Sequence, residues 1–439
     1  MFRFLAALGC LGLAVGFAAA QTAYLGETTA AGDCFEVDLA LNVTGKLKVD
    51  RGGRLEPLPL TAAAKHRFVE RTDSPDARGA VGKVLRKYSE AKSESRTAGE
   101  TAKRELAADR TLIVAQRTTA GTLHYCPDGP LTREELELTA EHFDTLCLPG
   151  LMPNKDVKVG DVWPVGPEAT QQACLLDGLI KSDLNGTITT VTADAITFTI
   201  AGPVEGVENG AQAKIAVTAT GKFSLVSKRL VALTWQQTDD RAQGPAGPAA
   251  EMTAIIALTR TPLTEEPKSL DAAARAKLPA DDKATAAFTK LKFVDADGRF
   301  RFTYGRDWHI VGRTADHLVL RLLDEGDFTA QATLTVLKKL APGGRTTPDE
   351  FKTMLAAIPN WAPETIVEDR TIPLTDAAKQ LYRLSVRGKQ DGAAVLQTFT
   401  LLSGPQGEQL AVTILTPPDK ATKIAGRDLE LLKAVDFGK

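Results

Sequence analysis

The middle of the chain alternates apolar and polar side chains over one short segment after another, a period of two that is typical of half-buried β-strands. These segments are residues 186–191, 195–201, 213–219, 221–226, 230–238 and 252–259. Asn185-Gly186 and Asn209-Gly210 are turn dipeptides of the kind that join antiparallel strands in tight hairpins. Residues 35–49 repeat the alternation nearer the start of the chain. We therefore expect a β-rich first domain built on a curved antiparallel sheet.

Residues 70–108 have a different pattern. They are polar and rich in Lys, Arg, Glu, Ala and Ser. Their few apolar residues with helical spacing are Val81, Val84, Leu85 and Tyr88. This thin stripe predicts one or two surface helices. Further along, Thr132 and Glu135 have the spacing of a capping box, which predicts that a helix begins there.

The chain is long enough for two domains. Its 439 residues, 43% of them hydrophobic and 25% charged, are more than one core usually serves. Composition changes abruptly at residues 263–289, which are rich in Ala, Lys and Asp and include Pro267 and Pro279. We interpret this segment as an interdomain linker. It separates a first domain, residues 21–262, from a second, residues 290–439.

The second domain is predicted to follow the order β-β-β-α-β-β-β-α. Its first helix has a strong start, with Thr347 as N-cap, Pro348 at the first helical position and Glu350 at the third. That order fits an α/β sandwich, an antiparallel sheet flanked by helices, and does not fit a doubly wound nucleotide-binding fold. The whole chain is therefore predicted to be α+β.

The first twenty residues have the layout of a secretory signal peptide. Arg3 supplies an early positive charge, residues 5–17 form an apolar run, and residues 18–20 are all Ala, a small-residue cleavage site before Gln21. Nothing later approaches the roughly 20 consecutive apolar residues of a membrane helix. We expect a mature protein that begins near Gln21, is periplasmic or secreted, and has no integral membrane segment.

The charge balance excludes one class of partner. The chain has 53 Lys and Arg against 55 Asp and Glu, a formal charge of −2. The predicted signal peptide removes only one charge, that of Arg3. A nearly neutral chain has no electrostatic footprint for nucleic acid and no basic stripe for an anionic membrane surface. We expect no nucleic-acid partner.

The expected export bears on the oxidation state of the cysteines. Of five in the chain, Cys10 lies inside the signal segment, which leaves Cys34, Cys126, Cys147 and Cys174. An even number in an exported protein favours disulfides, and four cysteines allow three connectivities that sequence alone does not separate. The pairing that we prefer joins Cys34 to Cys174 and Cys126 to Cys147.

The second domain resembles a known group in the aromatic strand at residues 300–308, Phe-Arg-Phe-Thr-Tyr-Gly-Arg-Asp-Trp, and in the order of its elements. Residues 290–439 look like the PsbP/Mog1-like sandwich, whose DcrB-like bacterial members are also exported. Gly305 is a departure, because such domains often carry proline there. The resemblance implies a non-enzymatic binding or assembly role and no catalytic residue. Residues 148–153 and 159–163 are similar to uncharacterised exported bacterial domains, which implies no function.

Several motifs suggest chemistry and have a simpler explanation. Two thiols and two imidazoles could form a zinc site, but no Cys-x-x-Cys pair is present and exported thiols usually oxidise. These four residues are His124, Cys126, His142 and Cys147. Ser89 and Lys92 match an S-x-x-K pattern without the further element such enzymes carry, so a solvated surface explains them better.

Two further groups of residues could form sites. Asp295 and Asp297 echo the start of a calcium loop but lack its remaining ligands, so a hairpin turn is the simpler interpretation. Asp161, Trp163 and Trp308 could line a cleft, although large aromatic side chains usually serve packing.

From these observations we expect an exported, non-catalytic binding or assembly protein of the cell envelope, with no catalytic, cofactor or metal residues. Its partner would be another envelope protein, bound on the sandwich sheet or in the cleft between domains. The alternative is a carrier of an apolar ligand, because a curved sheet covered by a helix can enclose a cavity. A third class, a metal- or disulfide-dependent enzyme, requires His, Cys and acidic groups to converge in one pocket.

Overall fold

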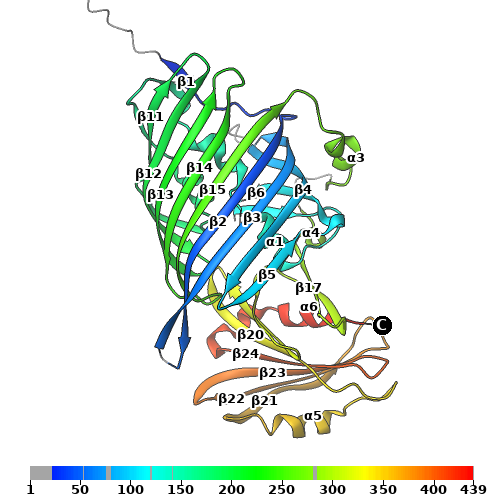
Figure 1. The fold of residues 1–439 in the computed structure, drawn as a ribbon. Helices are drawn as coiled ribbons and strands as arrows, with labels where there is room; N and C mark the ends of the chain where they lie inside the picture. The colour runs from blue at the N-terminus through cyan, green and yellow to red at the C-terminus, as the bar shows by residue number, and fades with distance from the viewer. Residues whose placement is uncertain are drawn as a thin grey trace, which may run out of the picture.

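The computed structural model describes residues 22–52, 54–75, 81–118, 121–140, 142–279 and 284–438. The predicted signal peptide, residues 1–20, lies outside this part of the chain. A large sheet, coloured blue to green in Figure 1, stands beside a smaller domain coloured yellow to red. Within the described ranges, no helix is both long and apolar enough to cross a bilayer.

One antiparallel sheet of 13 strands forms the first domain. From edge to edge its order is β7 (Gly121–Tyr125), β6 (Leu112–Thr118), β4 (Val81–Thr97), β3 (Arg54–Pro75), β2 (Cys34–Arg51), β15 (Ala249–Leu263), β14 (Arg229–Arg241), β13 (Ala211–Ser224), β12 (Ala195–Glu208), β11 (Asn185–Val191) and β9 (Val162–Pro164). Outside this path, β5 (Glu100–Glu105) pairs with β4 and β10 (Gly178–Ser182) with β12. A separate pair joins β1 (Ala23–Leu25) to β8 (Lys155–Val157).

Two runs of consecutive hairpins make this sheet. One runs from β2 to β7 and the other from β11 to β15. They meet where β2 pairs with β15, with Cys34 opposite Leu263 at one end of the ladder. The expected antiparallel sheet is therefore present, and its central seam joins strands far apart in the sequence.

Alternation predicts the middle strands well. Along β13 buried and exposed residues alternate almost without a break, which confirms that one face is covered. Residues 213–219 and 221–226 are predicted as two strands, but β13 is a single strand that ends at Ser224. Asn209 and Gly210 both have positive φ, 49° and 77°, in the hairpin that precedes it, as a tight turn requires. Asn185-Gly186 makes no turn and instead begins β11.

Within the described part of residues 70–108 the predicted surface helices are absent, because β3, β4 and β5 occupy most of it. On β4, Val84 packs on one side with Leu146, while Leu85 packs on the other with Leu112 and Leu270. A strand buried on both faces has apolar residues at adjacent positions, and these mimic the stripe of a helix. The prediction was wrong for this reason.

Short helical segments cover one face of the large sheet. They are α1 (Arg133–Ala140), the 3-10 helix η2 (Thr145–Leu151) and α2 (Pro167–Ala173). The predicted capping box of α1 is confirmed, since Thr132 Oγ1 accepts from Glu135 N and Glu135 Oε2 accepts from Thr132 N. Phe143, just before η2, lies with its ring 5.4 Å from that of Trp235 on β14. Large side chains therefore fill the space above this face.

The segment predicted as a linker packs partly on the first domain. It contains the 3-10 helix η3 (Lys268–Leu270), α3 (Ala272–Arg275) and α4 (Ala286–Thr289), and residues 280–283 lie outside the described ranges. Leu270 is fully buried in the first domain, and the ring of Phe288 stacks on Tyr125 at 5.5 Å. A further 3-10 helix, η1 (Ala108–Arg110), joins β5 to β6.

The second domain contains two antiparallel sheets. The smaller has the order β16 (Leu291–Val294), β17 (Phe300–Tyr304) and β25 (Asp436–Phe437). The larger, of seven strands, has the order β18 (Trp308–Arg313), β19 (His317–Asp324), β20 (Asp327–Val336), β24 (Gln409–Thr416), β23 (Ala393–Ser403), β22 (Gln380–Gln390) and β21 (Trp361–Ile372). Its helical segments are α5 (Pro348–Leu355), the 3-10 helix η4 (Pro418–Ile424) and α6 (Arg427–Lys433).

The predicted α+β class and helix-flanked sandwich are wrong. The chain is mostly β, with 56% of it in strands and 14% in helices. The predicted helix starting at Thr347 exists with both hydrogen bonds of its capping box, but it is only eight residues long. The predicted order of elements omits β16, β18, β21 and β25. In β21 nearly every side chain is exposed, so no apolar alternation marks it as a strand.

Hydrogen bonds from two arginines connect the two domains. Arg133, at the start of α1, donates from Nη2 to the carbonyls of Arg306 and Trp308, at 3.0 and 2.8 Å. Arg306 donates in the opposite direction, from Nη2 to the carbonyl of His124 at 2.5 Å. A backbone bond of 2.7 Å from Lys292 N to Leu131 O lies between the same two domains. The junction therefore has a defined geometry.

Candidate functional site

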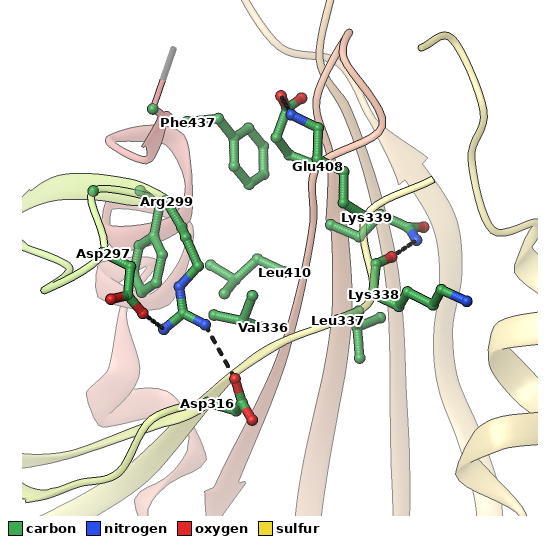
Figure 2. Close-up of a pocket in the computed structure, with 14 residues that line it drawn as sticks. Asp297, Arg299, Asp316, Val336, Leu337, Lys338, Lys339, Glu408, Leu410 and Phe437 are labelled. Atoms are coloured by element: carbon green, nitrogen blue, oxygen red, sulfur yellow. Dashed lines mark hydrogen bonds and ion pairs between the residues drawn. The ribbon is translucent and has the colours of Figure 1, made fainter. Parts of the chain in front are cut away.

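Two adjoining pockets, which we name the Phe437 groove, open where strand ends of the second domain converge. Their volumes are about 530 and 620 Å³. The residues that line both pockets are Gly298, Phe300, Glu408, Phe437 and Gly438. Phe437, on the short strand β25, therefore belongs to the wall of each. Figure 2 shows the first pocket with this ring at its border.

The floor of the first pocket is apolar. Val336 ends β20, Leu337 follows it, and Leu410 lies near the start of the neighbouring strand β24. Figure 2 shows Leu410 and Val336 between Arg299 on one side and the two lysines on the other. Leu410 is fully buried, so it joins the floor to the core of the domain. Such a surface suits an apolar side chain of a ligand.

Arg299 fixes one wall of the groove. Its guanidinium is bidentate to Asp295, with Nε–Oδ2 at 2.8 Å and Nη2–Oδ1 at 3.0 Å, and its Nη1 donates to Asp316 at 3.0 Å. These hydrogen bonds hold the pKa of Asp295 below its usual value. Because Asp316 precedes β19 and Asp295 follows β16, Arg299 ties the small sheet to the large one.

The opposite rim carries two lysines and a glutamate. Lys339 Nζ lies 2.9 Å from Glu408 Oε1. Partial burial works to raise the pKa of Glu408, but hydrogen bonds from Lys339 and from backbone N–H groups outweigh it and leave this pKa below normal. Lys338 is exposed and forms no ion pair within the described part of the chain. One cation of the rim is thus available to a ligand.

Asp295 and Asp297, which resemble the start of a calcium-binding loop, form a turn, as the simpler interpretation predicted. Gly298 N donates to the carbonyl of Asp295 at 2.9 Å, and Gly298 has a φ of +69°. Asp295 Oδ2 also accepts from the backbone of Asp297. The carboxylate oxygens of Asp295 are thus occupied by backbone and guanidinium donors.

The residues predicted to share a cleft do not meet. Trp163 is buried in the first domain, where its Nε1 donates to Leu151 O at 3.1 Å and its ring packs edge-on to Phe198. Asp161 accepts from Lys158 N in the preceding turn. Trp308 is buried in the second domain, at the start of β18. Both tryptophans serve packing, because their side chains are buried and neither is exposed in a common cleft.

The predicted disulfides are not formed. Cys34, Cys126, Cys147 and Cys174 are all buried as free thiols. Burial raises the pKa of each, and that of Cys174 reaches about 12. Two of the thiols donate to backbone carbonyls instead, Cys34 Sγ to Gly32 O and Cys147 Sγ to Asp144 O. Thiols with raised pKa values are also poor nucleophiles.

The other chemical hypotheses find no geometry to support them. No group of three or more His, Cys, Asp or Glu that could hold a metal ion occurs in the ranges the structure covers. His142 Nε2 accepts from the hydroxyl of Tyr88 at 2.8 Å, and its Nδ1 donates to Phe143 O. Ser89 and Lys92 lie on β4, where Lys92 pairs with Glu90.

Sequence reasoning missed a charged cluster under the large sheet. Arg86 on β4 is fully buried and contacts Glu70 at 2.9 Å, Asp144 at 2.6 Å and Thr145 at 2.8 Å. Its Nη1 lies 3.4 Å from His124 Nε2. Burial lowers the pKa of His124 to about 4, so its ring is neutral at pH 7. No sequence signal marks Arg86, because β4 carries other charged residues such as Lys83, Lys87 and Glu90. The cluster is sealed from solvent and holds η2 against the sheet.

Comparisons with known proteins do not show a family for this chain. No protein-family model and no curated protein matches it. PsbP (CyanoP) from Synechocystis sp. PCC 6803 is similar at 12% identity and a TM-score of 0.27, over 36% of this chain and 99% of that one. A protein from Bacteroides thetaiotaomicron is similar at 11% identity and a TM-score of 0.26. The match covers 35% of this chain and 50% of the Bacteroides chain.

A third likeness is to lipovitellin, at 5% identity and a TM-score of 0.28, over 55% of this chain and 27% of that chain. All of these values describe weak and partial fold similarity. They carry no conclusion about activity, substrate or partner.

Proposed function

We propose that this protein is a non-catalytic binding or assembly protein of the cell envelope, and that it holds a segment of a partner protein in the Phe437 groove. The observation that carries the proposal is the chemistry of the groove: an apolar floor, a partly exposed aromatic ring shared by both pockets, and Lys338 on the rim. Apolar pockets with a few charged groups at the border are typical of recognition sites.

The ionisable groups of the groove support binding rather than catalysis. Arg299, Asp295 and Glu408 are engaged in ion pairs and hydrogen bonds that keep them charged. A general acid or base needs a pKa near the working pH, and the pKa shifts of Asp295 and Glu408 go in the opposite direction. The resemblance of residues 290–439 to the PsbP/Mog1-like group supports the same role, and membership in that group is part of the proposal.

The apolar-carrier alternative gains no support from the first domain. The covered face of the sheet packs against buried side chains of the segment that holds η2, including Phe143, Leu148 and Leu151. These side chains occupy the space that a lipid-like ligand would need. The periplasmic or secreted location belongs to the proposal and rests on residues 1–20.

Site-specific photo-crosslinking tests the proposal. A photoreactive amino acid is placed at Lys338 on the rim of the groove, and in a control at Val226, a position 79% exposed between β13 and β14. With native envelope extract we expect a discrete adduct from position 338 that position 226 does not give. Phe437→Ser should weaken this adduct, because it removes the ring shared by both pockets. Identical adducts at the two positions, or none at position 338, would contradict the proposal.

A further inference from the structure

A third pocket, of about 350 Å³, lies at the junction of the two domains. We name it the junction pocket. Its walls come from β5, α1, the β12–β13 turn, the end of β14 with the loop that follows it, and β18 of the second domain. The charged residues that line it are Arg104, Arg133, Glu137, Glu208 and Arg241. It shares no residue with the Phe437 groove.

The guanidinium groups of this pocket are only partly used. Arg104 Nη1 lies 3.0 Å from Glu137 Oε2, and Arg241 Nη1 donates to Glu208 Oε1 at 2.8 Å. Each of these pairs uses one nitrogen of a group that can bind an oxyanion through two. Arg133 donates through Nη2 to backbone carbonyls and has no carboxylate partner within the described residues. Donor capacity therefore remains at all three arginines.

The electrostatics of the pocket favour an anion. Three guanidinium groups face two carboxylates, so one positive charge remains even when both carboxylates are ionised. Burial raises the pKa of Glu137 and of Glu208 against the opposing pull of their arginine partners. Burial and then Arg133 lower the pKa of His309 to about 4, so this neighbour adds no charge at pH 7. An oxyanion of a ligand would therefore bind next to arginines whose carboxylate partners, Glu137 and Glu208, are poorly solvated.

We propose that the junction pocket binds a small metabolite that carries carboxylate or phosphate groups, held by Arg104, Arg133 and Arg241. The volume suits a small polar molecule rather than a protein segment. Because β18 closes the pocket from the second domain, the bound ligand would contact both domains at once. This site is independent of the partner proposed for the Phe437 groove.

Titration of the full mature chain with defined probes tests the proposal. Succinate and inorganic phosphate represent the two sources of oxyanion, and sodium chloride at the same ionic strength is the reference. Binding is measured by calorimetry and by the rise in the thermal unfolding midpoint, which grows with ligand concentration when a ligand binds the folded state. We expect saturable binding of at least one probe, and the better probe identifies the ligand class.

Each matched variant removes both partners of an ion pair. Arg241→Gln with Glu208→Gln deletes a pair in the pocket and leaves no unpaired charge. Arg96→Gln with Glu94→Gln deletes an exposed pair of similar length, 2.9 Å, on β4. We expect the first variant to bind about tenfold or more weakly, as for the loss of a charge-assisted hydrogen bond, and the second to bind like the wild type. Ala246→Phe fills the pocket without changing its charge and should also prevent binding.

Hydrogen exchange locates the binding. Saturating probe should protect peptides from α1 and β18, which lie on opposite sides of the junction. The proposal fails if neither probe binds beyond the effect of chloride, if both ion-pair variants lose affinity equally, or if protection appears elsewhere. A failure here leaves the crosslinking result at the Phe437 groove unaffected, so the two proposals are separable.

Discussion

Replacing Arg86 by Met should cost the first domain about 3–5 kcal/mol of unfolding free energy at neutral pH, the usual cost of breaking a buried ion pair from one side. Arg86 is fully buried, with Glu70 and Asp144 within 2.9 and 2.6 Å. Methionine fills a similar volume, so the loss comes mainly from two carboxylates that remain buried without a cation. A domain is typically stable by about 5–15 kcal/mol, so this is a large fraction.

The loss should depend on pH in a defined direction. Burial works to raise the pKa of Asp144, and Arg86 and then His124 outweigh it and keep this pKa below its usual value. Without Arg86 the effect of burial prevails, and the folded-state pKa rises above the unfolded value near 4. A raised carboxyl pKa means that the folded state takes up protons first as pH falls. The defect of the variant should therefore shrink between pH 7 and pH 5.

Urea unfolding combined with hydrogen exchange of peptides from β3, β4 and η2 measures the effect and assigns it to the first domain. Arg96→Met on the same strand is the control, because Arg96 has 68% of its side chain exposed and should change stability by less than about 0.5 kcal/mol. Adding Glu70→Gln and Asp144→Asn to Arg86→Met should recover most of the loss. If Arg86→Met costs no more than the control, or if the triple variant is weaker still, the electrostatic reasoning is refuted.

Three further predictions concern the first domain. Burial lowers the pKa of His66 and of His124 to about 4, so in this pH range the unfolded chain binds protons that the folded chain does not. Each histidine should therefore lower the free energy of unfolding by up to roughly 3 kcal/mol as pH falls from 6.5 to 4. Urea midpoints at pH 7 and pH 5 that coincide would contradict this. Gly186→Val should destabilise by about 1–3 kcal/mol or more, because a Cβ there lies 2.1 Å from the ring of Trp163, and thermal unfolding measures the change. The four cysteines of residues 22–438 should react slowly with a thiol reagent when native and fully when denatured, whereas disulfides would leave the denatured chain unreactive.

The parts of the fold that local patterns determine could be predicted from the sequence. β13 has one covered face, so its alternation is visible, and Asn209-Gly210 marks its turn. The capping boxes at Thr132 and Thr347 are likewise local, since each needs only residues three positions apart. Where a strand is buried on both faces, as β4 is, or exposed along its length, as β21 is, the period of two disappears and the prediction fails.

The site residues escaped prediction because distant segments build them. Arg86 meets Asp144 only after the segment that precedes η2 folds back onto β4. The Phe437 groove combines the end of β20 with β25, the last strand of the chain. Neither combination leaves a spacing or motif in the sequence. The cysteine prediction failed for a related reason, because an even count constrains pairing only if the folded chain brings the thiols together.

The seam between β2 and β15 sets an order of events for folding. The hairpins from β2 to β7 can pair as soon as they are synthesised, but β2 then presents a long open edge until β15, some two hundred residues later, arrives beside it. Contacts between such distant residues slow folding and expose the intermediate to aggregation. A fragment that ends before β15 should therefore associate with itself through this edge, and the completed ladder protects the full chain from doing so.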